Sequence, residues 1–450
     1  MKNHILKKDT MARKGSFVES FNPFIGSYVF WLADKEENSP VEVRGRMLLE
    51  LVKIAPTEIY PGWTLAGEPF TIAPGNPGFS PDPETDYARF IAAKGIDAPY
   101  EEIMAACEKH ISRGKFLQSE APGKYAGWNF IGTDKVYSAR GWIENHSIRD
   151  YAKLIRIGFG GIKREIEAQA KQTAFLKAAS NVCEAGILLG KRYAELARQM
   201  GLPEMAEICE RVPEHGATCF REAVQALWFG HILTCGEDGI NANSLGRLDQ
   251  ILYPYYENDN ISREEALDLM EELACKQYLD YDVQAITLGG VDADGNCAVN
   301  ELSYLILEAT ENMDVIRDLS VRIDQNTPVK FLKKCAGMIL RGGGLPFIFN
   351  DEAFIKALTD RGIRLEDARD YAPIGCVELT IPGKANPHAV SGWFNSTKCL
   401  ELAMFNGKDP GSGKQIGPET GCLADFTSFE KFYAAYQKQV EFFAVGYLPD

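Results

Sequence analysis

Three short apolar segments decide the predicted fold of this chain: DLSVRID (318–324), GGGLPFIFND (342–351) and YAPIGCVELT (371–380). Each has the length of a strand, and the stretches between them carry helical patterns. This alternation is typical of parallel strands with helices outside, because parallel neighbours need a crossover connection. The sequence therefore predicts an α/β fold.

Helix-start signals occur in the same region. Ser262 and Glu265 form a capping box before the helical pattern REEALDLMEELACKQY (263–278). Thr327 is predicted to be an N-cap, with Pro328 at the first helical position, where its missing N–H is not needed. These signals predict that a helix begins at each point.

The first half of the chain is predicted to be mainly helical. Helical patterns cover 41–55, 147–200 and 220–235, and the last is apolar nearly all round, so we expect it to be deeply buried. Residues 56–90 are rich in Pro and Gly and are expected to form loops and short strands. The basic start, 1–17, lacks the apolar stretch of a secretory signal and is expected to be a frayed, solvated terminus.

Charge and cysteine usage exclude several classes of protein. The formal net charge is −15, which argues against nucleic acid as the main partner because phosphates would be repelled. No apolar run reaches the roughly 18 residues of a membrane span. The 11 cysteines are scattered without a CxxC pair, which fits a reducing compartment and indicates no metal cluster. We therefore expect a cytoplasmic protein with no bound metal and no membrane partner.

One thiol and one carboxyl stand out as candidate catalytic groups. Cys376 follows Gly375, and glycine permits a backbone conformation or close approach that a β-carbon forbids. Glu378 would face the same side as Cys376 if the segment is extended, because side chains alternate along a strand. Such a pair suits hydrogen-atom and proton transfer. Taken alone, a cysteine in an apolar run is more often a packing residue.

The motif IGCVE (374–378) resembles the cysteine loop of glycyl radical enzymes of the pyruvate formate-lyase-like superfamily. Further segments are similar to family signatures in the same order: 190–200, 208–232, 245–259, 287–309 and 393–421. Pyruvate formate-lyase itself has two adjacent cysteines, whereas Val377 follows Cys376 here. The resemblance is therefore to the dehydratase- and decarboxylase-like branches.

This resemblance implies a fold and a mechanism. The fold is a ten-stranded barrel with helices outside, of which this chain would supply about the first half. The domain would cover 41–450, after an N-terminal extension over 1–40. Cys376 would become a thiyl radical that takes a hydrogen atom from a small substrate, and Glu378 would act as acid and base for dehydration, C–S cleavage or C–C cleavage.

The resemblance also implies partners. No cofactor would be bound directly; a glycyl radical, installed by a radical SAM activating enzyme, would generate the thiyl radical. A homodimer is expected, and a separate chain carrying the glycyl radical domain is a further expected partner.

Four positions match substrate-contacting or pocket-lining residues of some family members: His146, Arg140, Ser320 and Trp393. Asp150 is added as a substrate-binding candidate because it lies four residues after His146, one helical turn away, where the two side chains could interact. An arginine such as Arg140 suits an anionic substrate group. Each has an ordinary alternative: capping support at a helix start for His146, a solvated surface for Arg140, a surface ion pair for Asp150 and core packing for Trp393. Four aromatic residues near Arg140 would enlarge an apolar pocket or serve the core: Trp128, Phe130, Tyr137 and Trp142.

The family's radical-bearing RVxGY/F pattern is absent. RVPEHG (211–216) lies in the wrong place, and FFAVGYLPD (442–450) lacks the Arg-Val lead. Three explanations stay open: a truncated gene, a split enzyme completed by another chain, or a degenerate paralogue without radical chemistry. We expect the isolated chain to be inactive. A thiol-dependent hydrolase is a further alternative, but its nearest histidine in sequence, His388, is an unconvincing partner for Cys376.

Overall fold

The computed structural model describes residues 2–13, 22, 24–36, 39–68, 82–96, 98–108, 130–131, 136–238, 243–278, 284–314, 318–375, 377–385 and 388–447. The chain divides into two compact units, which are described separately. The first unit comprises Met1–Cys107 and Asn145–His388, and the second comprises Glu108–Glu144 and Ala389–Asp450.

The elements of the first unit alternate between helices and short strands in its second half. Its helices are α1 (Lys2–Arg13), α3 (Phe24–Glu36), α4 (Pro40–Ile54), α5 (Pro83–Lys94), α7 (Tyr151–Glu167), α8 (Ala174–Gln199), α9 (Pro203–Arg211), α10 (Phe220–Asp238), α11 (Leu248–Glu257), α12 (Arg263–Tyr278), α13 (Glu301–Met313), α14 (Val329–Leu340), α15 (Asp351–Asp360) and α16 (Leu365–Arg369). Its strands are β3 (Gly246–Arg247), β4 (Ile286–Gly289), β5 (Leu319–Ile323), β6 (Phe347–Asn350), β7 (Ala372–Ile374) and β8 (Glu378–Thr380).

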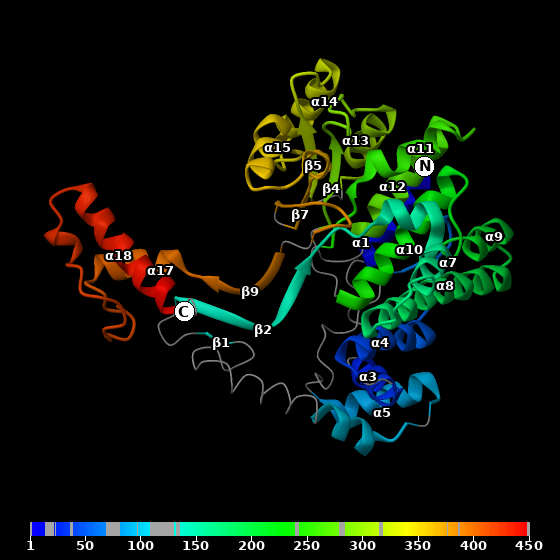
Figure 1. Ribbon diagram of the computed structural model, residues 1–450, viewed down its shortest axis with the longest axis horizontal. Coiled ribbons are helices and arrows are strands. Elements are labelled where there is room, and N and C mark those ends of the chain that lie inside the picture. Colours follow the sequence, from blue (N-terminus) through cyan, green and yellow to red (C-terminus); the bar gives the residue numbers. More distant parts are fainter. Residues whose placement is uncertain are drawn as a thin grey trace. The chain divides into compact units, whose positions relative to one another are not determined.

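The predicted parallel sheet is present. Strands β3, β4, β5 and β6 form one sheet in that order, and each neighbouring pair is parallel. In Figure 1, β4 and β5 lie side by side with α13 and α14 next to them. The prediction of an α/β fold with parallel strands is confirmed.

The two faces of β5 differ in character. Leu319 and Val321 alternate with Ser320 and Arg322, and all four side chains are buried. Leu319 and Val321 belong to the main hydrophobic core, as do Leu302, Leu305 and Ile306 of α13. Because side chains alternate along a strand, Ser320 and Arg322 point to the opposite face. The sheet therefore has one apolar face and one polar face.

The third apolar segment does not repeat the strand–helix scheme. β7 and β8 form an antiparallel hairpin, with Ile374 opposite Glu378. The prediction that YAPIGCVELT is another strand of the parallel series is therefore wrong for this segment. Its apolar residues suited a buried strand of either kind, and strand direction is decided by pairing.

Helix starts agree with the sequence in one case and differ in the other. At α12, the Ser262 hydroxyl accepts from Glu265 N at 3.2 Å and the Glu265 carboxylate accepts from Ser262 N at 3.0 Å, so the capping box is confirmed. Helix α14 begins at Val329 with Pro328 as its N-cap. The Thr327 hydroxyl instead bonds to Asp324, accepting from its N–H and donating to its carboxylate. The prediction of Thr327 as N-cap is wrong because the local turn uses that hydroxyl.

The N-terminal residues are more ordered than predicted. Lys2–Arg13 form α1, whose Leu6 is 2% exposed and packs in a cluster with Trp63 and Met313. The expectation of a frayed start is wrong for this stretch, because Leu6 finds an apolar partner surface. Helix α3 also contributes Phe24 to the main core. Residues on both sides of position 41 therefore pack into the same main hydrophobic core.

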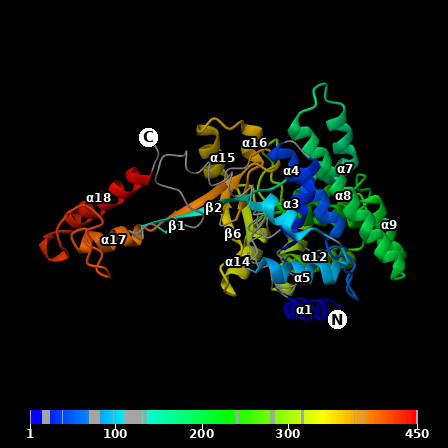
Figure 2. The same ribbon diagram turned by 90° about the horizontal axis from the view of Figure 1, so that it is seen from below.

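Helices α4, α7, α8, α9 and α10 form the helical half of the first unit. Helices α7 and α8 lie side by side in both views (Figures 1 and 2). Helix α10 is buried on nearly all sides between Ala223 and Cys235, as its apolar sequence predicted. The helical pattern expected over 147–200 begins later, at Tyr151, and is interrupted before Ala174. None of the helices in the described part of the chain combines the length and apolar character needed to cross a bilayer.

The second unit is smaller. Its strands β1 (Phe130–Ile131), β2 (Tyr137–His146) and β9 (His388–Phe394) form a sheet in that order. The last residues of β2 and the first residue of β9 belong to the first unit. Its helices are α17 (Ser396–Met404), the 3-10 helix η1 (Leu423–Asp425) and α18 (Phe429–Tyr447). Val136, Cys399, Leu402 and Phe443 form its small core.

Candidate active site

The predicted site residues differ in how far the structure describes them. Cys376 lies outside the described residues. Arg140 is on β2 and Trp393 is on β9, and their side chains also lie outside the description, as do the four aromatic side chains near Arg140 and the imidazole of His388. The side chains of His146, Asp150, Ser320 and Glu378 are described. The geometry of the site therefore begins from Glu378.

Glu378 stands at the end of a tight turn between β7 and β8. The Val377 N–H donates to the Ile374 carbonyl at 2.8 Å. Gly375 has a φ of 48° and Val377 a φ of 82°, so neither residue is extended. The assumption of an extended segment, from which we placed Cys376 and Glu378 on one side, is therefore wrong. The shared orientation of the two groups stays a prediction.

Gly375 is closely packed against two of the predicted site residues. A β-carbon at this position would stand 2.4 Å from His146 Nδ1 and 2.9 Å from Glu378 Oε2. Together with the positive φ, this contact requires glycine. The expectation that Gly375 permits a close approach is confirmed.

His146 and Glu378 form the central pair of the site. His146 Nδ1 lies 3.7 Å from Glu378 Oε2. The imidazole is buried, whereas the Glu378 side chain keeps 29% of its surface exposed. At this distance a protonated imidazole and an ionised carboxylate attract each other.

His146 is positioned by the residues that follow it. The Ser147 carbonyl accepts from Ser244 N at 3.0 Å, just before β3, and the Ile148 carbonyl accepts from Gly383 N at 2.9 Å, after β8. The chain after His146 is thereby tied to both the parallel sheet and the hairpin. Backbone contacts, rather than a helix, place the imidazole beside Glu378.

Asp150 does not lie one helical turn from His146, because residues 147–150 are not helical. Its carboxylate accepts from Lys153 N at 3.0 Å and caps the start of α7. An aspartate in this position stabilises the helix N-terminus. A role in substrate binding stays a prediction.

A second carboxyl, Asp318, lies near Glu378 and was not singled out from the sequence. It precedes β5 and is 2% exposed. Burial, and then the charge of Glu378, raise the pKa of Asp318 to about 7. The signal was present in the strict alternation of DLSVRID, in which Asp318, Ser320 and Arg322 share one face.

Two buried arginines on the polar face of the sheet hold the segment before the hairpin. Arg322 forms a bidentate pair with Asp351 at 2.8 Å for each bond and donates to the Tyr371 carbonyl at 2.8 Å. Arg247 of β3 donates to the Asp370 carboxylate at 3.0 Å. The bidentate geometry is specific to arginine. The sheet thus fixes where β7 begins, and with it Gly375 and Glu378.

His231 is a buried histidine whose two ring nitrogens both contact polar groups of the core. Its Nε2 lies 2.9 Å from Gln284 Oε1, and its Nδ1 lies 3.2 Å from the Tyr151 hydroxyl. Burial lowers the pKa of His231 to about 4, which keeps the ring neutral. It is satisfied within the core and lies in helix α10, so we assign it no catalytic role.

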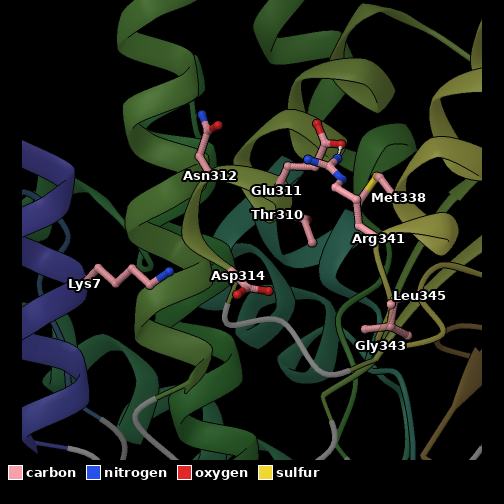
Figure 3. Close-up of a pocket in the computed structure, with 10 residues that line it drawn as sticks. Lys7, Thr310, Glu311, Asn312, Asp314, Met338, Arg341, Gly343 and Leu345 are labelled. Carbon is pink, nitrogen blue, oxygen red and sulfur yellow. Dashed lines mark ion pairs between the residues drawn. The ribbon is translucent and has the colours of Figure 1, made fainter.

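A pocket of about 650 Å³ lies elsewhere in the first unit, beside α1, the end of α13 and the loop after α14 (Figure 3). Its Glu311 is ion-paired with Lys334 and Arg341, and Asn312 donates to Glu271 at 2.7 Å. None of the predicted site residues lines it. Within the described ranges, no three His, Cys, Asp or Glu side chains gather in a way that would hold a metal ion.

Comparison with known proteins identifies related chains. Residues 124–448 match the family model described as pyruvate formate lyase-like. The chain is 34% identical over 387 residues to trans-4-hydroxy-L-proline dehydratase of Clostridioides difficile, covering 76% of this chain and 48% of that protein. It is 32% identical over 342 residues to isethionate sulfite-lyase of Oleidesulfovibrio alaskensis, covering 66% and 41%.

The structural comparison agrees. The glycerol-bound B12-independent glycerol dehydratase from Clostridium butyricum superimposes with a TM-score of 0.79 and 29% identity, over 99% of this chain and 62% of that one. The chain spans about half the length of the curated relatives it matches.

Proposed function

Because this chain belongs to the pyruvate formate lyase-like family of glycyl radical enzymes, we propose that it carries the thiyl-radical site of a radical lyase. In this proposal the sulfur radical of Cys376 takes a hydrogen atom from a carbon of a small organic substrate. Glu378 takes the proton of the adjacent hydroxyl and passes it to the leaving group as that group departs from the neighbouring carbon, and the product radical then takes a hydrogen atom back from the Cys376 thiol. The bond broken is C–O, C–S or C–C.

The observation that carries the proposal is the packing of His146, Glu378 and Gly375 around the turn that contains position 376. The pair of His146 and Glu378 stands 3.7 Å apart, and Gly375 leaves no room for a further side-chain atom. Radical chemistry needs shielding from water and stray hydrogen donors, which would quench a radical, and the buried imidazole of His146 contributes to that shielding. The same packing also supports a proton-transfer role for Glu378.

The proposal includes roles for other groups. The radical on Cys376 derives from a glycyl radical installed by a radical SAM activating enzyme, and no residue of this chain binds a cofactor directly. His146 orients the substrate beside Glu378, and Ser320, Asp150, Arg140 and Trp393 contribute substrate contacts. A homodimer in the cytoplasm is part of the same proposal.

The test is anaerobic activation followed by electron paramagnetic resonance spectroscopy. The protein, supplied with a competent activating enzyme and a glycyl radical domain, is expected to show a glycyl-type doublet. Cys376→Ser should abolish turnover of a dehydratase or lyase substrate and leave the doublet intact. The proposal fails if no doublet forms, or if Cys376→Ser retains turnover.

A second candidate function is that of a subunit completed by further strands. Among the described strands β6 has β5 as its one hydrogen-bonded neighbour, and its Phe347 and Ile348 are 41% and 50% exposed. An apolar edge strand favours pairing with another strand. Those strands would belong to a longer form of this protein or to a separate chain with the glycyl radical domain.

This second candidate is tested by co-expression with a chain that carries an RVxGY pattern. Co-elution of the two chains, lost in Ile348→Lys, supports it. Independent elution of a fully active 450-residue chain contradicts it.

A further inference from the structure

Three buried side chains beside the catalytic turn carry oxygen atoms without a partner. Asp318 is 2% exposed, and Ser320 and Thr287 are 0% exposed. Within the part of the chain that the structure describes, neither carboxylate oxygen of Asp318, nor Ser320 Oγ, nor Thr287 Oγ1 has a hydrogen-bond partner. Buried polar atoms are nearly always bonded, so three such groups together point to a ligand.

The three side chains lie on one face of the parallel sheet. Thr287 of β4 is directly opposite Ser320 of β5 in the register. Asp318 stands two residues before Ser320, and its carbonyl accepts from Ile286 N at 3.0 Å. Because side chains two residues apart share a face, Asp318, Ser320 and Thr287 form one cluster.

This cluster lies on the face against which the catalytic hairpin is held. Arg322, two residues after Ser320, donates to the Tyr371 carbonyl, and Arg247, opposite Thr287, donates to Asp370. Glu378 is near enough for its charge to raise the pKa of Asp318, although burial contributes more. The cluster therefore adjoins the carboxyl proposed to take part in the reaction.

The electrostatics of this face favour a cation. The charge of Arg322 is balanced by its bidentate pair with Asp351, and that of Arg247 by Asp370. The charge of Glu378 acts on Asp318 and raises its pKa, and His146 lies beside Glu378. Above the pKa of Asp318, a carboxylate or sulfonate beside it would be repelled by both carboxylates, whereas a cation would be attracted.

We propose that Asp318, Ser320 and Thr287 form a subsite for a protonated amino group of the substrate. An ammonium group has three N–H donors and no acceptor, so it matches one carboxylate and two hydroxyl oxygens. The inference rests on the proposed function, since it takes the substrate to lie beside Glu378. It narrows the substrate class to amines that carry a hydroxyl or another leaving group on a neighbouring carbon.

The test uses three probes that share one carbon frame: 3-amino-1,2-propanediol, glycerol and glycerate. Their binding to the 450-residue chain is measured by isothermal titration and by the ¹³C carboxyl resonance of Asp318, assigned by its loss in Asp318→Asn. We expect the amine to bind about tenfold more tightly than glycerol, which is the worth of one charge-assisted hydrogen bond. Glycerate should bind more weakly than glycerol.

Variants separate the subsite from adventitious binding. Asp318→Asn should remove the preference for the amine, and Ser320→Ala with Thr287→Val should reduce it several-fold. Asp360→Asn on the exposed surface of α15 removes the same charge elsewhere and should leave the preference intact. The Asp318→Asn protein is checked by its unfolding curve. Absence of amine binding, or a preference that survives in Asp318→Asn, overturns the assignment.

These measurements need no radical. Their failure would remove the amine subsite and leave the radical-lyase proposal to its own spectroscopic test, and the reverse also holds.

Discussion

His146 Nδ1 lies 3.7 Å from Glu378 Oε2, and Gly375 is packed against both atoms. This relationship joins the end of β2 to the turn before β8. It depends on three separate features: the backbone hydrogen bonds made after His146, the arginines that hold the segment before β7, and Gly375, whose missing β-carbon leaves room for the His146 imidazole. Each of these contacts, and the electrostatics that follow from them, can be tested by substitution.

Gly375→Ala should distort the turn and displace His146. The new β-carbon would stand 2.4 Å from His146 Nδ1 in a residue with a φ of 48°. We expect a loss of roughly 2–4 kcal/mol in unfolding free energy, from backbone strain and overpacking together. Gly95→Ala is the matched control, because Gly95 has a φ of 62° and nothing within 4 Å of its β-carbon position. It should cost about 1 kcal/mol. If urea unfolding shows the same loss of unfolding free energy in Gly375→Ala and Gly95→Ala, the contact with His146 does not contribute to stability.

Arg322→Met should destabilise the first unit by roughly 3–5 kcal/mol, because it leaves the Asp351 carboxylate buried without its partner. Arg322 and Asp351 are both buried and share two bonds of 2.8 Å. The double variant Arg322→Met/Asp351→Leu should recover part of that loss. Arg361→Met at an exposed position is the control and should change stability by less than about 0.5 kcal/mol. A single variant as stable as the control would contradict the anchoring role.

Asp318→Asn should stabilise the protein at pH 8 and have little effect at pH 4. The pKa of Asp318 is raised from 3.8 to about 7 in the folded protein, so between these values the folded state holds a proton that the unfolded state has lost. Stability therefore falls as pH rises from about 4 to about 7, and this penalty disappears in the variant. We expect a gain of roughly 2–4 kcal/mol above pH 7. Urea unfolding at both pH values measures it, and an equal effect at pH 4 and pH 8 would refute the prediction.

Glu378→Gln should lower the pKa of Asp318 without restoring its ordinary value. The charge of Glu378 is the smaller of the two causes of the raised pKa, and burial is the larger. The ¹³C carboxyl titration of Asp318 measures the change. Glu366→Gln, on the exposed surface of α16, should not alter that titration. An unchanged midpoint in Glu378→Gln would mean that the two carboxyls are not electrostatically coupled.

The local sequence identified much of the fold and the centre of the site. Strand and helix alternation predicted the parallel sheet, and the Ser262–Glu265 capping box was placed correctly, because both depend on residues close together in the chain. The motif IGCVE directed attention to Gly375 and Glu378 in the same way. Cys376 itself lies outside the described residues, so its role stays a prediction.

The errors arose where a segment's environment decides its structure. YAPIGCVELT contains apolar residues that suit either a parallel strand or a hairpin, and only pairing with β8 made it a hairpin. From the sequence, the Thr327 hydroxyl was expected to cap a helix, but in the structure it donates a hydrogen bond to the Asp324 carboxylate. Leu6 was expected to be solvated because its apolar partners lie far away in the chain.

The sequence by itself therefore determined the family, the alternation of elements and the glycine beside position 376, since each is encoded in a short run of residues. Only the tertiary structure decided that His146 meets Glu378, that Arg322 and Arg247 hold the segment before β7, and that the charge of Glu378 acts on Asp318. The physical reason is that burial and charge act through space. An aspartate before a strand is ordinary in sequence, and its unusual pKa exists because the fold removes water and brings a second carboxyl close to it.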